Sequence, residues 1–336
     1  MTVAIHTKQR FHPGELAVQR RAGVAQQAAR LEGMLGAPRL DGGAAKFLAE
    51  RKFAVLTARD GAGRLWTSPL TGRAGYLHAH GSTLDVHAVL PAADPLAGLP
   101  TGQQAGLIAV EFAIRRRFRV NGTITAADDS GLTIEADQAF GNCPSYIQQR
   151  ALTHTDNAGA SEPDSASQPS HGVITAQARS LIESADTFFL GTVHLERGAD
   201  SSHKGGLPGF VRVEGDELWW PDYAGNNMFN SLGNLTANPE ASLLFIDFTA
   251  GRTLQLSGTA ELQWIAAGSD GDDGDTGRRI RFHPRATVSR CVPVLRAGLA
   301  VASPDNPPLK GIARAIAESA TDAEAHLNHG QASEGG

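Results

Sequence analysis

The feature that most constrains the fold is an internal duplication of roughly 70 residues in each half of the chain. Residues 66–76 (WTSPLTGRAGY) align with 200–210 (DSSHKGGLPGF), and residues 106–122 (GLIAVEFAIRRRFRVNG) align with 242–258 (SLLFIDFTAGRTLQLSG). Chance similarity between glycine-rich strands explains a few of the identities but not the whole series. We therefore expect two tandem domains of one fold. The matched positions pair Ser68 with Ser202, Gly72 with Gly206, Gly75 with Gly209, Leu96 with Leu232, Leu99 with Leu235, Glu111 with Asp247, Phe112 with Phe248, Arg116 with Arg252 and Gly122 with Gly258.

Both repeats have the pattern of antiparallel β-structure. Residues 253–264 (TLQLSGTAELQW) alternate apolar and polar side chains, as a strand with one solvated face does. Short strands joined by turns that contain Gly, Asp and Pro favour a barrel or a sandwich. The sequence has no G-x-G-x-x-G turn and no G-x-x-x-x-G-K-[ST] loop, which disfavours dinucleotide-binding and P-loop folds.

Helical periodicity and composition divide the rest of the chain. We expect helices over residues 14–35, 44–51 and 174–185, and a mobile loop over the acidic, glycine-rich residues 268–277. A segment rich in Ser, Ala, Pro and Asp has almost nothing to bury and is typical of a linker. The predicted order is an N-terminal helical extension (1–43), a first repeat (44–155), a linker (156–172), a second repeat (173–310) and a C-terminal helix with a polar tail (311–336).

Composition excludes several classes of protein. The formal net charge of -5 gives no overall attraction to nucleic acid or to an anionic membrane, and no apolar run is long enough to span a bilayer. Two cysteines are too few for a disulfide framework or for a four-cysteine zinc site. The first 15 residues lack the apolar core of a signal peptide, so we expect a cytoplasmic protein.

Three motifs stand out in the second half: residues 188–193 (FFLGTV), 201–213 (SSHKGGLPGFVRV) and 221–248 (PDYAGNNMFNSLGNLTANPEASLLFIDF). They resemble motifs of the pyridoxamine 5'-phosphate oxidase-like, FMN-binding split-barrel superfamily. Residues 11–19 (FHPGELAVQ) and 142–148 (NCPSYIQ) are similar to motifs of the larger, duplicated members. The resemblance covers residues 11 to about 265 and implies two tandem six-stranded antiparallel split β-barrels with flanking helices.

The resemblance also implies a cofactor and an assembly. Simpler members of the superfamily are homodimers that bind FMN between subunits, so a duplicated chain can build the same interface as an intrachain pseudo-dimer. A further homodimer is left open. The superfamily includes oxidases, reductases, heme-handling proteins and proteins that use other flavins, so it does not fix the reaction.

The best candidate for a phosphate-binding segment is the glycine-flanked turn around Lys204. Ser201 and Ser202 offer hydroxyl donors, Lys204 offers a cation, and the glycines let the backbone approach an anion closely. The alternative is an exposed hairpin corner. The first repeat has Ser68, Pro69 and Leu70 at the matching positions, so we expect phosphate to bind well at one pseudo-equivalent site, in the second repeat.

The asparagine-rich segment 221–235 supplies further candidate ligands. We expect Tyr223, Asn227, Asn230 and Ser231 to contact the cofactor through amide, hydroxyl and aromatic groups, although asparagine also caps helices and adopts left-handed conformations. Asn226 is a further amide in the segment, and Asn234 is a candidate to brace the turn. The aromatic pair Trp219 and Trp220 either stacks on the flavin or belongs to the core, which we favour.

The densest basic run is residues 115–119 (RRRFR). On a strand, Arg115, Arg117 and Arg119 share one face and Arg116 lies on the other. This face is either solvated or contributes one arginine, for which we choose Arg117, to the flavin across the pseudo-dimer interface.

Two remaining motifs are interpreted as structural. Cys143 belongs to a turn that we expect to place Tyr146 and Ile147 in the core. His78 and His80 lie on one side of a predicted strand and could ligate a metal or heme, but no third ligand is evident, so we predict no metal site.

The sequence thus predicts an FMN-dependent oxidoreductase that acts on an unidentified small molecule through flavin N5, without nucleic acid or membrane partners. No residue stands out as general acid or base, and Glu111 and Asp247 are expected to brace turns. The alternatives are a non-catalytic flavin- or heme-binding protein, an enzyme that uses heme or deazaflavin in the same fold, and a structural repeat without a cofactor.

Overall fold

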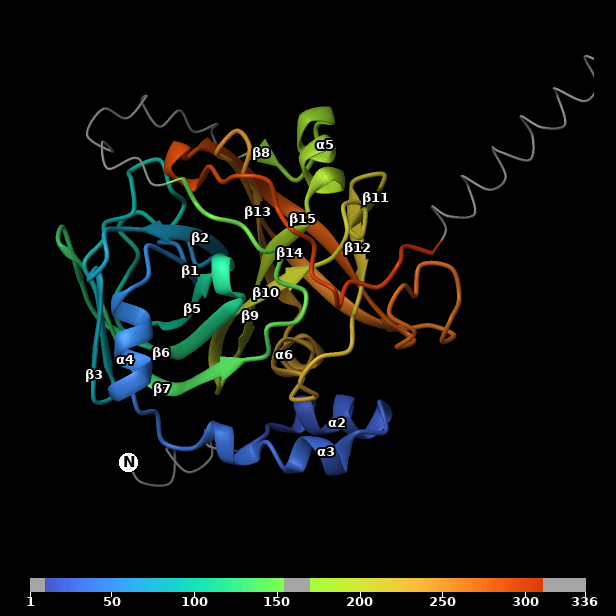
Figure 1. The fold of residues 1–336 in the computed structure, drawn as a ribbon, viewed down its shortest axis with the longest axis horizontal. Helices are drawn as coiled ribbons and strands as arrows, with labels where there is room; N and C mark the ends of the chain where they lie inside the picture. The colour runs from blue at the N-terminus through green and yellow to red at the C-terminus, as the bar shows by residue number, and fades with distance from the viewer. Residues whose placement is uncertain (1–9, 154–169, 311–336) are drawn as a thin grey trace, which may run out of the picture.

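The computed structural model describes residues 10–153 and 170–310, and it is mainly β-structure in two tandem antiparallel sheets (Figure 1). The first sheet has the strand order β2-β1-β5-β6-β7-β4-β3. Its strands are β1 (Phe53–Arg59), β2 (Leu65–Thr71), β3 (Leu77–His80), β4 (Thr83–Val86), β5 (Gln104–Glu111), β6 (Arg116–Asp128) and β7 (Gly131–Asn142).

The second sheet repeats this order as β10-β9-β13-β14-β15-β12-β11, with the short β8 paired to β15. The expected tandem β-domains are therefore confirmed, with seven strands rather than six along each path. Its strands are β8 (Ser170–His171), β9 (Thr187–His194), β10 (Gly198–Gly205), β11 (Arg212–Glu214), β12 (Glu217–Pro221), β13 (Glu240–Asp247), β14 (Arg252–Trp264) and β15 (Arg278–Cys291).

The register of the strands supports the duplication in detail. Glu111 pairs with Arg116 across β5 and β6, and Asp247 pairs with Arg252 across β13 and β14. The ladder is interrupted at matching places, immediately before Gly122 and Gly258. A Cβ on either glycine would lie 2.1 Å from a carbonyl oxygen of the next strand, so each bulge requires glycine.

The turns after these strands are braced by acids, as expected. Glu111 accepts a hydrogen bond from the Ala113 N–H and pairs with Arg51 at 2.6 Å. Asp247 accepts bonds from two backbone N–H groups of its turn and pairs with Arg252 at 2.8 Å.

The helices are short and flank the sheets. The expected helix over 14–35 is wrong in its length, because Gly23 adopts φ 73° and interrupts it. The observed helices are α2 (Pro13–Arg21), α3 (Ala25–Ala29), η1 (Glu32–Leu35), α4 (Gly42–Ala49), η2 (Phe112–Ile114), α5 (Ala176–Ser184), α6 (Asn230–Ala237) and η3 (Pro293–Leu295).

Each domain has its own apolar core, and a third cluster joins the two. Phe53 and Val55 of β1 pack in this cluster with Phe189 of β9 and Leu244 of β13, all buried. Polar contacts continue the interface, since the hydroxyls of Thr67 and Ser242 lie 2.7 Å apart. The two halves of one chain therefore form the predicted pseudo-dimer interface.

The prediction of a mobile acidic loop over 268–277 is wrong. Asp272 is fully buried and accepts hydrogen bonds from the N–H groups of Gly268, Thr276 and Gly277. Asp273 is also buried and pairs with Arg212 at 2.9 Å. The loop is therefore ordered around two buried acidic side chains. Its acidic composition alone does not predict that these side chains are buried.

The expected linker falls largely on residues 154–169, and the expected C-terminal helix and tail fall on 311–336. Both lie outside the described residues. Within the described ranges, no helix combines the length and the apolarity that a bilayer crossing requires.

Candidate functional site

The main candidate site is a cavity where the two domains meet, between the start of β6, the end of β7, the strands β10 and β12, and the start of α6. It encloses about 880 Å³ of space, part of which is open to solvent.

Seven of the eight predicted site residues line this one cavity. Ser201 does not, because strand alternation turns it away from its neighbours Ser202 and Lys204, and its side chain is fully buried. The seven are Arg117, Ser202, Lys204, Tyr223, Asn227, Asn230 and Ser231.

One wall of the cavity is a buried polar network that crosses the domain interface. Arg119 of the first domain donates to Asp200 at 2.7 Å and to Ser202 at 2.8 Å. The hydroxyls of Ser202 and Ser231 lie 2.7 Å apart. Arg119 therefore holds both serines in place. It also neutralises the Asp200 carboxylate, whose burial without a partner would destabilise the fold.

A second cation lies beside this wall. The Lys204 ammonium is 3.8 Å from Asp222, which also accepts a hydrogen bond from Arg278 at 2.9 Å. Burial is the main influence on Lys204 and lowers its pKa. Because Asp222 already has Arg278 as a closer partner, the charge of Lys204 is only loosely compensated.

Arg117 is the third cation and reaches the cavity from the first domain. Its guanidinium donates to His203 Nδ1 at 2.9 Å, and burial lowers the pKa of Arg117 to about 10. As predicted, Arg116 lies on the opposite face of β6, over the ring of Phe47. Arg115 instead donates to the backbone carbonyl of Ile147 at 3.0 Å.

The contact with Arg117 fixes the tautomer of His203. A guanidinium can only donate hydrogen bonds, so Nδ1 of His203 is the acceptor and the proton of the neutral ring is on Nε2. Burial lowers the pKa of His203 well below its usual value, which keeps the ring neutral. Nε2–H is buried and has no partner among the described residues.

The start of α6 forms the facing wall. Phe229, at the N-cap, has φ 59° and provides no side-chain cap, so the first N–H groups of the helix are available to a ligand. Asn227 precedes it with φ 62°. Asn226 does not offer its carbonyl to the cavity, because that oxygen accepts a bond from the Met228 N–H at 3.1 Å.

The aromatic residues of the cavity differ from expectation in one respect. Trp220 is buried and packs on Phe188 with ring centroids 5.0 Å apart, as a core residue does. Ile147 is buried as predicted, but Tyr146 is not in the core: it has φ 65° and lines the cavity. Its ring lies 5.1 Å from that of Tyr223, so the NCPSYIQ turn helps to form the site.

The pseudo-equivalent position in the first repeat is closed by side chains. Ser68 donates to Asp94 at 2.6 Å and accepts from Gln255 at 2.8 Å, and Asp94 pairs with Arg290. All four residues are buried. Internal partners therefore occupy the place that corresponds to the serine and cation of the open cavity.

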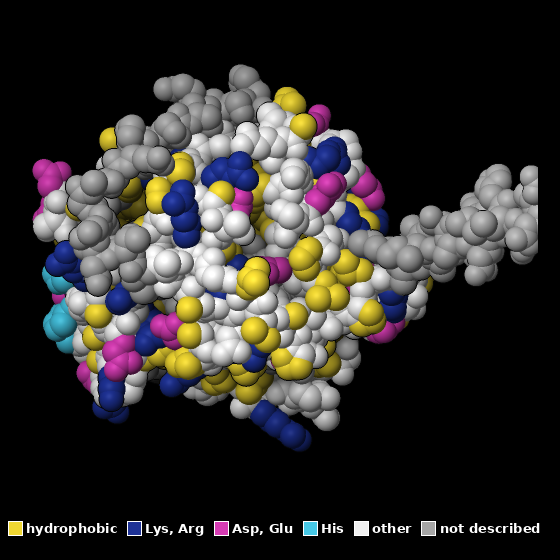
Figure 2. All heavy atoms as spheres, turned by 45° about the horizontal axis from the view of Figure 1, so that its top comes forward, with side chains coloured by type: hydrophobic (Ala, Val, Ile, Leu, Met, Phe, Trp, Pro, Cys, Tyr) yellow, Lys and Arg dark blue, Asp and Glu magenta, His cyan; other side chains and the backbone are white. Residues whose placement is uncertain are grey.

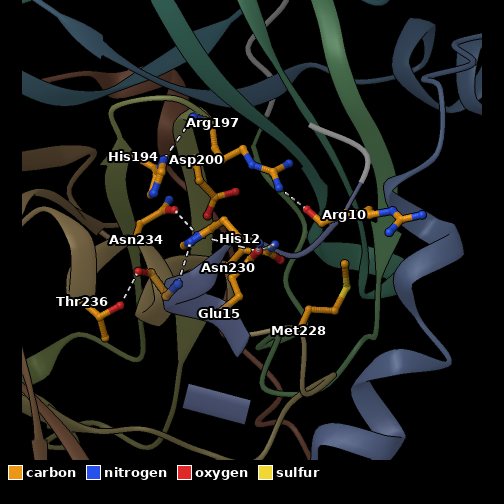
Figure 3. Close-up of polar contacts among 12 residues, drawn as sticks. Arg10, His12, Glu15, His194, Arg197, Asp200, Met228, Asn230, Asn234 and Thr236 are labelled. Carbon is orange, nitrogen blue, oxygen red and sulfur yellow. Dashed lines mark hydrogen bonds and ion pairs between the residues drawn. The ribbon is translucent and has the colours of Figure 1, made fainter. Parts of the chain in front are cut away.

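The FHPGE motif explains how α6 is held in position. Pro13 begins α2, and His12 and Glu15 form a capping box at its N-terminus. Glu15 then accepts a hydrogen bond from Asn230 at 2.6 Å, and His12 lies 3.2 Å from Asn234, so both reach α6 (Figure 3). Asn234 also donates to Thr192, which makes it a brace as anticipated.

Close backbone packing accompanies these contacts. A Cβ on Gly14 would lie 2.3 Å from the Gly233 carbonyl oxygen, and a Cβ on Gly233 would lie 2.6 Å from the Glu15 nitrogen. The two helices can therefore approach each other only because both positions are glycine. The motif is thus a clamp on the helix that forms one wall of the cavity.

Sequence reasoning did not select several residues that line the cavity: Arg119, Asn142, Cys143, Tyr146 and His203. Arg119 could have been selected from the sequence, because strand alternation places it on the same face as Arg117. Asn142, Cys143 and Tyr146 share the NCPSYIQ motif, but the left-handed turn that carries them to the cavity has no clear mark in the sequence.

Comparison with known proteins yields one family match. The family described as Pyridoxamine 5'-phosphate oxidase matches residues 174–318, which include the strands β9 to β15 of the second sheet. No curated protein matches the chain.

Several solved structures are similar to about one domain of the chain. HupZ of Group A Streptococcus is 17% identical over 34% of this chain and 91% of its own, with a TM-score of 0.28. A putative pyridoxamine 5'-phosphate oxidase of Lactobacillus delbrueckii is 13% identical over 34% and 93%, with a TM-score of 0.28. HutZ, a heme storage protein of Vibrio cholerae, is 11% identical over 40% and 99%, with a TM-score of 0.27.

The family match covers the second domain, and the first domain repeats the strand order, the register and the glycine bulges of the second. The second domain therefore matches the pyridoxamine 5'-phosphate oxidase family, and the first domain is a second copy of the same architecture.

Proposed function

We propose that the cavity binds FMN and that the protein is an FMN-dependent oxidoreductase acting on a small molecule. The observation that carries this proposal is the charge of the cavity wall. Three cations, Arg117, Arg119 and Lys204, and one carboxylate, Asp222, line the cavity. Three minus one leaves two positive charges, which match a phosphate monoester dianion.

The donors beside these charges suit the same group. Lys204, Ser231 and the first N–H groups of α6 would hold the phosphate, since helix N-termini and ammonium groups are its usual partners. Arg119 and Ser202 would orient Ser231 through the network that they share. Asn227 and Asn230 would meet the polar edge of the ligand, and Tyr146 and Tyr223 would cover its apolar part.

His203 favours a flavin over heme. Its Nε2 carries a proton, so it presents a hydrogen-bond donor rather than the lone pair that heme iron needs. An unpaired buried donor in the cavity wall calls for an acceptor on the ligand, such as a phosphate or carbonyl oxygen.

FMN, when bound, supplies electron or hydride transfer at its N5 atom. The residues of the chain would bind and orient it, and the guanidinium of Arg117 would compensate negative charge near the cavity. Both walls come from one chain, so the proposal needs no partner subunit, and the closed first-repeat position leaves one FMN per chain.

The test is an absorption spectrum of the purified protein with and without FMN, followed by equilibrium titration and by anaerobic addition of NADH or NADPH. We expect one FMN per chain and bleaching of the flavin band by a reductant. A protein that binds FMN but is not reduced would be a carrier or sensor. A heme Soret band, a deazaflavin spectrum or no chromophore binding at all would contradict the proposal.

A further inference from the structure

A separate group of potential metal ligands lies on the β3–β4 hairpin of the first domain. His78 and His80 occupy alternate positions of β3, so both project from its exposed face, and His78 lies directly opposite Asp85 of β4. Exposed histidine side chains are visible at the left edge of Figure 2, the side on which Figure 1 shows β3. None of the three residues lines the cavity between the domains.

The three side chains converge on one point. Nδ1 of His78 is 3.8 Å from Asp85 Oδ2, and Nδ1 of His80 is 3.7 Å from the same oxygen. One ligand atom from each residue lies within 4.8 Å of the others. Ligands of a tetrahedral zinc ion are about 3.4 Å apart, so shifts of about 1.5 Å would complete the site. Exposed side chains on a hairpin can make such shifts by small χ rotations.

A fourth residue orients the carboxylate. The hydroxyl of Thr133, on the neighbouring strand β7, donates to Asp85 Oδ1 at 2.8 Å. This contact occupies one carboxylate oxygen and leaves the other, Oδ2, to face both imidazoles. Metal-binding carboxylates are commonly held by such a second hydrogen bond, which an isolated surface ion pair does not require.

The fold itself does not demand these residues. In the second domain the corresponding hairpin places Arg212 opposite Trp219, and Arg212 pairs with Asp273. The same pair of short strands therefore forms with quite different side chains. The combination of two histidines, a carboxylate and an orienting hydroxyl is particular to the first domain.

We propose that His78, His80 and Asp85 form a binding site for one divalent first-row transition metal ion such as Zn²⁺. Two imidazoles and a carboxylate are ligands that these ions prefer over Mg²⁺ or Ca²⁺, which favour oxygen. Three protein ligands leave at least one coordination position for water or another small ligand. The site is on the surface, so such a ligand has direct access.

The test uses the full-length chain without a histidine tag, freed of metal by a chelator and titrated with Zn²⁺ by calorimetry. We expect one Zn²⁺ per chain at this site, and at least tenfold weaker binding after His80→Ala or Asp85→Asn. Thr133→Val leaves all three ligands in place and should weaken binding by about tenfold, as loss of an orienting partner does.

His283→Ala is the matched control, because His283 is a partly exposed histidine paired with a single carboxylate, Glu217, at 2.8 Å. It should leave the affinity unchanged. Thermal melts without metal check that each variant is folded, and Zn²⁺ should raise the melting temperature of the wild type but not of His80→Ala. Equal Zn²⁺ affinity in the wild type, His80→Ala and Asp85→Asn, or no binding by the wild type, would overturn the proposal.

Co²⁺ provides an independent readout of the ligand type. Binding at this site gives the d–d bands of nitrogen and oxygen ligands, and these bands should disappear in His80→Ala. A thiolate-to-cobalt charge-transfer band that persists in His80→Ala would place the metal at a cysteine instead, and would overturn the assignment to the hairpin.

Discussion

Glu15 of the FHPGE motif accepts a hydrogen bond from the side-chain amide of Asn230, with 2.6 Å between Oε1 and Nδ2. Glu15 is buried beneath the cavity wall, whereas Asn230 lines the cavity at the start of α6. Glu15 is therefore a positioning residue: it orients a candidate ligand without contacting the cavity itself.

Glu15 should make stability depend on pH. Burial is the main cause that raises its pKa to about 7 from 4.5, so the folded protein holds a proton that the unfolded chain releases. The stability contributed by Glu15 is then complete below about pH 4.5 and is lost as pH rises through about 7. The free energy of unfolding relative to Glu15→Gln should fall by up to about 3 kcal/mol across this window.

Urea unfolding of both proteins at several pH values between 4.5 and 8 measures this difference. His12, whose pKa burial lowers to about 4, is present in both proteins, so its opposite contribution cancels. The other neighbours, His194, Arg197 and Asp200, are unchanged as well. Parallel stability curves for the two proteins would show that Glu15 is ionised throughout.

Lys204→Ala should weaken FMN binding at least tenfold. A charge-assisted contact to phosphate is worth roughly 1.5–3 kcal/mol, and each 1.4 kcal/mol is a factor of ten. The substitution leaves Asp222 with Arg278, so the protein should remain folded. Lys310→Ala is the control, because Lys310 pairs with exposed Asp275 and lies outside the cavity. Fluorescence titration that finds the same dissociation constant in both variants would remove Lys204 from the site.

Gly14→Ala should destabilise the protein by about 1–3 kcal/mol, since the new methyl group would overlap the Gly233 carbonyl oxygen. The same substitution at Gly43, inside α4, meets nothing within 4 Å and should stabilise by up to about 1 kcal/mol through helix propensity. Thermal unfolding distinguishes the two. If Gly14→Ala were as stable as Gly43→Ala, α2 would not pack tightly on α6.

FMN should protect Cys143 from alkylation and leave Cys291 reactive. Both cysteines are half-buried, but Cys143 lines the cavity, where Arg117 lies 3.8 Å from its sulfur. Mass spectrometry of peptides after iodoacetamide treatment, with and without FMN, gives the alkylation rate of each cysteine. Equal protection of both cysteines would indicate that FMN stabilises the whole fold against opening. No protection would place the FMN site away from Cys143.

Much of the architecture could be read from the sequence. Glu111 and Asp247 end matching strands, because each accepts hydrogen bonds from the turn that follows it. Contacts between residues this close in sequence recur in both repeats and can be recognised there. The alternation of Arg116 and Arg117 followed from strand geometry alone. The length of the first helix was mispredicted because helical spacing continues through Gly23, where the backbone turns left-handed.

Contacts between distant segments could not be read in this way. The composition around Asp272 predicts a mobile acidic loop, yet three N–H groups converge on its buried carboxylate. Asp85 was not recognised as a third ligand beside His78 and His80, since their proximity depends on hairpin register. Ser201 was included in the site because it is adjacent in sequence, although the strand turns it away.

The sequence by itself determined the duplicated β-fold and identified seven of the residues that line the cavity, because periodicity, turn glycines and motif chemistry act over short distances along the chain. The sequence also favours the second of the two equivalent positions, because the first repeat has Leu70 where the second has Lys204. Only the tertiary structure shows how the first position is closed. Ser68 and Ser202 look alike in sequence, but Asp94, Arg290 and Gln255 close one position, and Arg119 of the opposite domain frames the other. The closure of the first position depends on charged and polar side chains from distant segments. No local pattern in the sequence predicts that these side chains meet.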